Sequence, residues 1–221
     1  MFKKALIALS IAAVSAASAV AQAQPVDDYK KVEFFAGYSN GQVDTGVDSG
    51  NSAVDFFRDR ENFNGVNVSG VYNLTRYFGV KGDMSATFNS NRFTGETTIG
   101  GDPVTISAKN TNSLYNFVGG VQIKDNAKSG VFKPFAHAMV GVGHGRLKIS
   151  DYSCTPAADC PVPTFADTTI TETGFSGVFG GGIDFRVSNR FQIRAIQIDY
   201  NPTRFSGETQ NNLRLGAGIV F

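Results

Sequence analysis

Eight separate segments of the sequence alternate apolar residues with small or polar residues at a period of two. In an extended chain successive side chains point to opposite faces, so this period indicates β-strands with one apolar face. The last segment is typical, because Leu213, Leu215 and Ala217 alternate with Arg214 and Gly216. We therefore expect an all-β fold with the strands Lys31–Ser39, Gly65–Tyr72, Tyr77–Asn89, Asn112–Lys124, Phe132–Gly145, Thr173–Val187, Phe191–Tyr200 and Asn212–Phe221.

Apolar runs are too short for membrane helices once the first 23 residues are set aside. Among the longest is Ala138–Gly143, which is rich in glycine, whereas a transmembrane helix needs about 20 apolar residues. If the chain spans a membrane, it must do so as a closed barrel, because only helices and closed barrels satisfy their backbone hydrogen bonds in lipid.

The first 23 residues have the three parts of a secretory signal peptide. Lys3 and Lys4 precede an apolar stretch from Ala5 to Val20, and Ala21-Gln22-Ala23 is a cleavage signal. An N-terminal membrane anchor is the alternative, but alanine and serine dilute the apolar stretch. We expect cleavage after Ala23, export across a bacterial inner membrane, and a mature domain of residues 24–221 that can form disulfides.

Composition excludes two other classes of protein. The chain has 19 phenylalanines and 7 tyrosines to bury, which is unlike a disordered chain. Its formal net charge of +1 provides no basic surface for nucleic acid, so we expect no nucleic-acid partner.

Short and long connections alternate between the eight segments. Residues 73–76, 125–131 and 188–190 are short turns, whereas residues 40–64, 90–111, 146–172 and 201–211 are long. Short turns at one end and long loops at the other are typical of outer-membrane barrels with an even number of strands. A soluble β-sandwich is the rival, but the polar faces here are rich in glycine, serine, asparagine and threonine, which suits a narrow lumen.

Three stretches resemble the OmpA-like eight-stranded outer-membrane β-barrels. They are the opening strand Val32–Tyr38, the closing hairpin from Ile193 to Leu213, and the last strand, which ends on Phe221. The resemblance implies an up-and-down barrel in the outer membrane of a Gram-negative bacterium, in contact with lipid and lipopolysaccharide. It also implies partners during biogenesis, namely periplasmic chaperones and the barrel-assembly machinery, which would read the C-terminal signal Leu213, Leu215, Ala217, Ile219 and Phe221. Because the chain stops at Phe221, we expect no peptidoglycan-binding domain.

The inward faces carry charges that we expect to form two layers across the lumen. Counting from the short turns places Glu33, Lys81, Asp184 and Arg194 low, and Asp83, Asp199 and Arg214 higher, near His137. Unpaired ions are costly in such a confined space, so we predict the cross-strand pairs Asp184–Arg194 and Asp199–Arg214, each as a bidentate arginine fork, with Glu33 and Lys81 completing the lower layer.

The residue pattern of the seventh predicted strand indicates a β-bulge. Gln192 and Arg194 point inward if Ile193 faces lipid, but the same phase would place Gln197 and Asp199 in lipid. A charge on the lipid face costs a few kcal/mol, whereas one extra residue near Ala195-Ile196 restores the phase.

Two cysteines and two histidines are the remaining candidates for chemistry. Cys154 and Cys160 lie in the third long loop, and we expect a disulfide between them, with a metal site or free thiols as alternatives. His137 and His144 are assigned to opposite faces, which disfavours a two-histidine metal site. The first long loop contains Asp44, Asp48, Asp55, Asp59 and Glu61, but not at the spacing of a calcium-binding EF-hand.

These observations predict a structural or surface-interaction protein that presents four long loops. Phe35, Phe135 and Met139 share the inward faces with the charges, and eight strands enclose a lumen that side chains can fill, so a general porin is disfavoured. A narrow gated channel or a carrier of small solutes is the alternative, and an extracellular ligand would bind the loops. We expect no enzymatic activity, no cofactor and no metal, because no nucleophile elbow is present and the last two strands lack the histidine of lipid-A deacylases.

Overall fold

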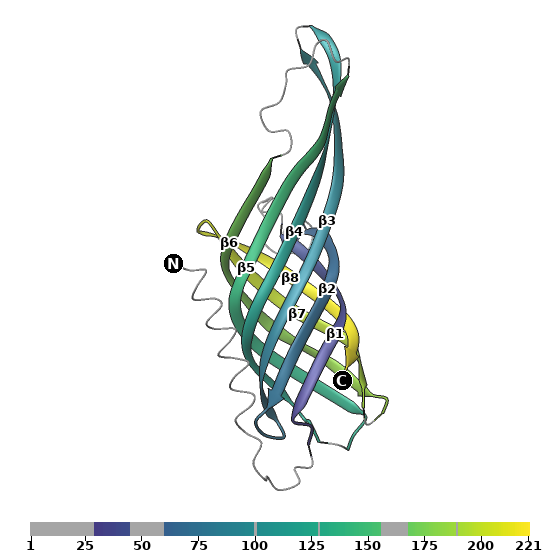
Figure 1. The fold of residues 1–221 in the computed structure, drawn as a ribbon, viewed down its shortest axis with the longest axis vertical. Helices are drawn as coiled ribbons and strands as arrows, with labels where there is room; N and C mark the ends of the chain where they lie inside the picture. Colours follow the sequence, from purple (N-terminus) through teal and green to yellow (C-terminus); the bar gives the residue numbers. More distant parts are fainter. Residues whose placement is uncertain (1–28, 45–59, 100, 128, 156–167, 189) are drawn as a thin grey trace, which may run out of the picture.

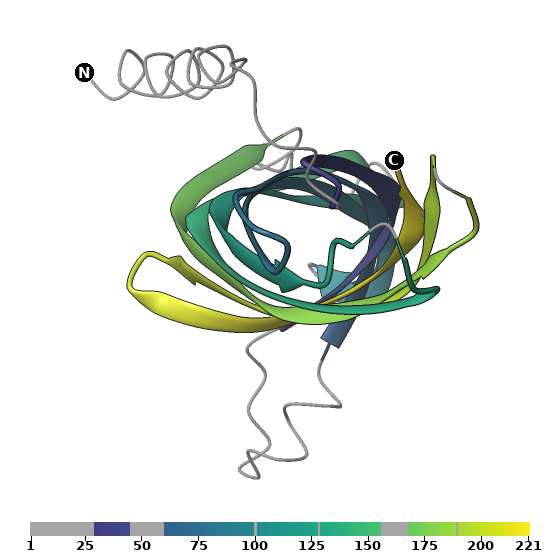
Figure 2. The same cartoon turned by 90° about the horizontal axis from the view of Figure 1, so that it is seen from below.

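A computed structural model describes residues 29–44, 60–99, 101–127, 129–155, 168–188 and 190–221. The segment predicted as a signal peptide lies outside these residues, as does Cys160. No helix among the described residues is long and apolar enough to cross a membrane. Eight antiparallel strands form a closed ring in chain order (Figures 1 and 2). The strands are β1 (Val32–Asp44), β2 (Arg60–Asn73), β3 (Phe78–Ile99), β4 (Asp102–Lys124), β5 (Phe132–Thr155), β6 (Thr169–Arg186), β7 (Gln192–Phe205) and β8 (Glu208–Val220).

The ring closes where β1 pairs with β8. The pairing runs from Phe35 opposite Val220 to Gln42 opposite Leu213, and Phe34 exchanges two backbone hydrogen bonds with Phe221. The two backbones approach closely at this seam, because a Cβ atom on Gly218 would lie 2.5 Å from the Cα of Gly37. Glycine is therefore required here by close packing rather than by its backbone angles.

The alternation of the sequence sorts the side chains onto the two faces of the barrel. Val68, Val80, Phe117, Val140 and Leu215 are among the large apolar residues exposed on the outer face. Many polar and charged side chains are buried inside, together with Phe35, Phe135 and Met139, as the sequence predicts. An apolar outer face around a polar interior is the inverse of a soluble β-sandwich.

The predicted bulge in β7 is present. The register between β7 and β8 shifts between Arg194 and Gln197, and Ala195 and Ile196 are both exposed in succession. As a result Gln197 and Asp199 return to the interior, while Ile198 faces outward.

Several connections predicted as loops are strands instead. Residues 90–99 and 102–111 continue β3 and β4 as a paired ladder, and β5 extends along β4 until Thr155 lies opposite Thr105. Figure 1 shows β3, β4 and β5 rising together beyond the other strands. We call this three-stranded sheet the arm and define it as residues 89–99, 102–112 and 146–155. Residues 201–211 are likewise a hairpin, with Ser206 and Gly207 at positive φ in its turn.

Candidate functional site

The lower polar layer lies near the short turns and joins four charged side chains. Arg194 donates from Nε to Asp184 Oδ1 at 2.8 Å and from Nη2 to Asp184 Oδ2 at 3.1 Å, which is a bidentate fork as predicted. Lys124 donates to Asp184 Oδ2 at 2.8 Å and to both carboxylate oxygens of Glu33 at 2.9 and 3.1 Å. Two cations thus neutralise two carboxylates.

Two aromatic rings hold the Arg194 guanidinium in place. Its central carbon lies 4.0 Å from the ring centre of Phe135 and 4.4 Å from that of Phe35. Because guanidinium groups stack favourably on aromatic faces, the clamp adds to the ion pair. The inward phenylalanines are therefore part of the charge layer.

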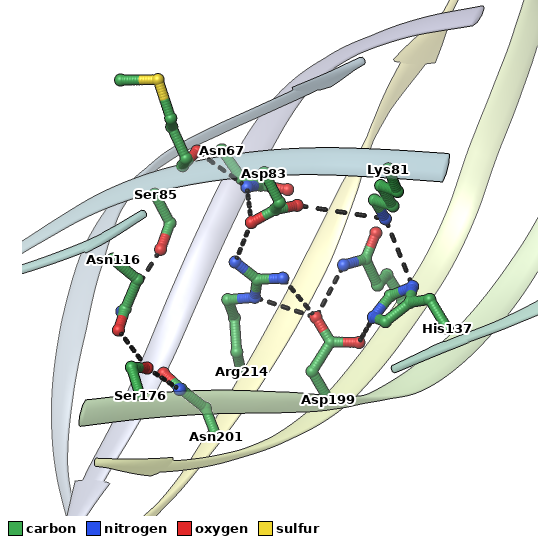
Figure 3. A network of polar contacts seen from close by, with 12 residues as sticks. Asn67, Lys81, Asp83, Ser85, Asn116, His137, Ser176, Asp199, Asn201 and Arg214 are labelled. Carbon is green, nitrogen blue, oxygen red and sulfur yellow. Dashed lines mark hydrogen bonds and ion pairs between the residues drawn. The ribbon is translucent and has the colours of Figure 1, made fainter. Parts of the chain in front are cut away.

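The upper polar layer is centred on Arg214, as Figure 3 shows. Arg214 donates from Nη1 to Asp83 Oδ1 at 2.6 Å and reaches Asp199 with two further nitrogens. Asn67 donates to the same Asp83 oxygen at 2.9 Å, and Gln197 donates to Asp199 Oδ2 at 2.6 Å. The second predicted ion pair, Asp199–Arg214, is therefore present, but it belongs to a larger network.

Lys81 belongs to this upper layer, which corrects the expectation that it completes the lower one. Its Nζ lies 3.2 Å from Nδ1 of His137 and 3.9 Å from Asp83 Oδ2, whereas Glu33 contacts Lys124. Lys124 is the residue that sequence reasoning missed, because it is the last residue of its predicted strand. Its inward phase, shared with Gln122, is the signal that identifies it.

His137 links Lys81 to Asp199. Its Nε2 lies 2.9 Å from Asp199 Oδ1, and its Nδ1 faces the Lys81 ammonium. A neutral imidazole with its proton on Nε2 matches both contacts, because Nδ1 can then accept from Lys81 while Nε2 faces a carboxylate.

A third, uncharged layer lies beyond Arg214. Ser176 donates to Asn116 Oδ1 at 2.8 Å, and Asn201 donates to Ser176 at 2.9 Å (Figure 3). These side chains, together with Asn212 and Thr203, are buried. The lumen is therefore filled by polar contacts over three levels.

A cavity lies at each end of this filled lumen. The cavity at the long-loop end has a volume of about 380 Å³ and is lined by apolar residues such as Phe63, Leu114 and Phe205, with Glu61 and Glu172. The cavity at the short-turn end has a volume of about 450 Å³, and its charged lining residues are Lys30, Lys133 and Arg186.

The other candidate residues have more limited roles. His144 lies at the outer rim with Nδ1 2.7 Å from the Thr173 hydroxyl, on the face opposite His137. Of the acidic loop, Asp48, Asp55 and Asp59 lie outside the described residues, and no three histidine, cysteine, aspartate or glutamate side chains gather as a metal site in the described part.

The disulfide stays a prediction, because Cys160 is not described. Leu213, Leu215, Ala217 and Ile219 occupy one phase of β8, and Phe221 follows its end; their role as an assembly signal stays a prediction.

Comparisons with known proteins agree with this architecture. The family model of the outer membrane protein β-barrel domain matches residues 6–221. The crystal structure of Ail, the attachment invasion locus protein of Yersinia pestis, matches 86% of this chain and 97% of its own, with 17% identity and a TM-score of 0.51. A second Ail structure, in complex with the heparin analogue sucrose octasulfate, matches the same shares with 18% identity and a TM-score of 0.51. Neisserial surface protein A matches 86% of this chain and 96% of its own, with 11% identity and a TM-score of 0.46. No curated protein matches by sequence.

Proposed function

Since the chain belongs to the outer membrane protein β-barrel domain family, we propose that it is a surface-interaction protein of the bacterial outer membrane. In this proposal the barrel anchors the protein, and the long-loop end faces the outside of the cell, as in other outer-membrane barrels. The arm and the loops beside it bind an extracellular ligand.

The open edge of the arm is the observation that carries this proposal. The pairing of β2 with β3 ends at Asn64 opposite Phe88, so among the described residues Asn89–Ile99 has a strand on one side only. An unpaired strand edge can bind an extended segment of another protein through backbone hydrogen bonds. Phe93, on this strand, has 63% of its surface exposed, and exposed aromatic side chains are frequent anchors of protein interfaces.

The filled lumen supports an anchoring role. Each charged layer contains two cations and two carboxylates in contact, and these side chains are buried within the lumen between the two cavities. A barrel closed in this way is suited to presenting a binding surface rather than to general diffusion.

Deleting most of the arm tests the proposal. Residues 91–110 would be replaced by an Asn-Gly turn, which keeps the membrane part of β3 and β4 and closes the hairpin with a favoured turn. Cells displaying each protein would be tested on extracellular matrix, serum proteins and sulfated polysaccharide, the last because one Ail structure holds a sulfated heparin analogue.

We expect adhesion by the intact protein, its loss in the arm deletion, and a several-fold loss in Phe93→Ala. Thr94→Ala is the matched control, because its side chain lies on the opposite face of the same strand. Equal adhesion by the intact and arm-deleted proteins would contradict the proposal.

A narrow gated channel is the second candidate, and the two cavities favour it. The charge layers separate the cavities together with the inward side chains of Phe35, Phe135 and Met139. Rearrangement of the ion pairs and of these side chains would join the cavities. Arg194→Ala should then raise the conductance of the protein in a planar bilayer, whereas Arg190→Ala, on an exposed turn, should not. Absence of channel events in both variants would eliminate this candidate.

We also propose the export route that the N-terminus and the last strand suggest. The signal peptide would be removed after Ala23, and periplasmic chaperones and the barrel-assembly machinery would receive the chain. The intact mass of protein purified from outer membranes would identify the mature N-terminus, and removal of Phe221 should reduce assembly.

A further inference from the structure

We propose that the cavity at the short-turn end is a binding site for a phosphate group on the periplasmic side of the barrel. It is lined by Lys30, from the segment before β1, by Lys133 of β5 and by Arg186 of β6. Asn126, Ser188 and Gln192 are its polar lining residues. The inference goes beyond the surface-interaction role, because it concerns the opposite end of the barrel.

The charge of the cavity is not balanced by the described residues around it. Its lining contains three cations and no carboxylate. Glu33 and Asp184, the carboxylates of the lower charge layer, are paired with Lys124 and Arg194. Asp125, whose charge acts on Lys133, is paired with Arg76. Lys30 and Arg186 form no ion pair within the described part of the chain.

Lys133 supplies charge to the cavity but no free hydrogen-bond donor. Its ammonium donates to the carbonyl oxygens of Asp125, Ala127 and Ser129 at 2.9, 2.6 and 3.2 Å. These contacts fix the cation beside the cavity without neutralising it. Burial lowers the pKa of Lys30, and the nearby charge of Lys124 lowers it further, whereas the charge of Glu33 opposes both effects.

Donors for an anion converge on the cavity from separate elements. Arg186 offers the planar guanidinium that binds phosphate oxygens in pairs, and Lys30 offers an ammonium. Asn126 is 3% exposed, and neither its amide nitrogen nor its amide oxygen has a hydrogen-bond partner. A buried amide without a partner is costly, so a ligand or an ordered water molecule at this cavity would relieve it.

A phosphate group fits this arrangement better than a single carboxylate. Three cations from three elements match an anion that has several oxygens and more than one negative charge. The volume of about 450 Å³ exceeds the size of a free phosphate ion and leaves room for an ester group. The source can be a soluble phosphate compound or the head group of a lipid in the inner leaflet of the outer membrane.

Titration with inorganic phosphate tests the proposal. The purified protein in dodecyl maltoside, which carries no phosphate, would be titrated in Tris chloride by calorimetry. We expect saturable binding of one phosphate per protein, weakened at least tenfold in Arg186→Gln and in Lys30→Gln. Arg190→Gln is the matched control, because Arg190 is an exposed residue near the same turn and does not line the cavity. Barrel integrity in each variant would be checked by the shift of electrophoretic mobility on heating.

Phospholipid nanodiscs distinguish the two sources. If a lipid head group is the ligand, inorganic phosphate should bind more weakly in nanodiscs than in maltoside, because lipid phosphate competes. If the ligand is soluble, the two affinities should agree.

The inference would be overturned by the absence of saturable binding, by an equal loss of affinity in Arg190→Gln, or by equal affinity for acetate and phosphate. Phosphate binding only by an Asp27→Asn, Asp28→Asn variant would overturn it as well, because carboxylates of the chain itself would then be the anions of the cavity.

Discussion

Arg214 places two of its nitrogens on a single oxygen of Asp199, with Nε and Nη2 at 2.9 and 2.7 Å from Oδ2. This geometry differs from the predicted bidentate fork, in which each nitrogen meets its own oxygen. The reason is that Oδ1 of Asp199 faces His137 at 2.9 Å. The Asp199 carboxylate therefore contacts both Arg214 and His137, and it connects these two side chains within the upper layer.

Asp199→Asn should destabilise the barrel by about 3–5 kcal/mol, the usual cost of removing one partner from a buried ion pair. The matched control is Asp125→Asn. Arg76 holds Asp125 at 2.8 and 2.9 Å and lowers the pKa of this carboxyl to about 2, but both side chains are nearly half exposed. Asp125→Asn should therefore lower the free energy of unfolding by at most about 1 kcal/mol. Urea unfolding followed by circular dichroism would measure the free energy of unfolding of both variants. Similar decreases in the two variants would show that burial does not make the Asp199 ion pair more important for stability.

Close packing at the barrel seam makes Gly218 sensitive to the smallest substitution. A Cβ at this position would lie 2.4 Å from the carbonyl oxygen of Ala36, which is backbone and cannot rotate away. Gly218→Ala should therefore reduce the fraction of folded barrel, as measured by heat-modifiable mobility. Gly82→Ala is the control, because a Cβ there would meet nothing within 4 Å. An unchanged fraction of folded barrel in Gly218→Ala would show that β1 and β8 can move apart enough to accommodate a Cβ atom.

The membrane part of the fold was predictable because lipid enforces the alternation. A polar residue on the lipid face is costly, so the phase of each strand, and even the bulge at Ala195, follows from the residue pattern. The arm was missed because it leaves the membrane region. Stretches such as Thr94–Thr98 are polar on both faces, and no apolar period marks them as strands.

The level of each charge within the lumen was harder to predict than its direction. Strands in a barrel are tilted and staggered, so counting residues from the short turns does not give the height along the axis. Counting therefore places Lys81 too low, whereas its side chain reaches His137 in the upper layer. Long lysine side chains also act at a distance from their own position on the strand, because Lys124 spans the lumen to Glu33 and Asp184.

The predicted disulfide between Cys154 and Cys160 should act locally. It closes a small ring, for which loop-closure entropy gives only about 2 kcal/mol. Reduction should therefore increase protease cleavage in this loop while the unfolding transition of the barrel stays unchanged. Mass spectrometry of the alkylated protein, with Cys154→Ser as the control, would establish the bond. Alkylation of both thiols without reduction would contradict it.

Deleting Ala195 should leave the barrel able to assemble, because Ala195 is the extra residue that the bulge accommodates. The register with β8 shifts between Arg194 and Gln197, and Ala195 and Ile196 both face outward there. Without Ala195, residues Arg194, Ile196, Gln197, Ile198 and Asp199 alternate between the two faces without interruption. Arg194 and Asp199 therefore stay in the lumen, where each can keep its buried ion pair, and no charge enters the hydrocarbon region, which would cost about 2–4 kcal/mol. Ala195→Ser, which keeps the bulge and a small side chain at this exposed position, is the control. Refolding into lipid vesicles would measure both variants. Failure of the deletion variant to assemble under conditions in which Ala195→Ser assembles would contradict this account and would show that the bulge does more than set the phase of the strand.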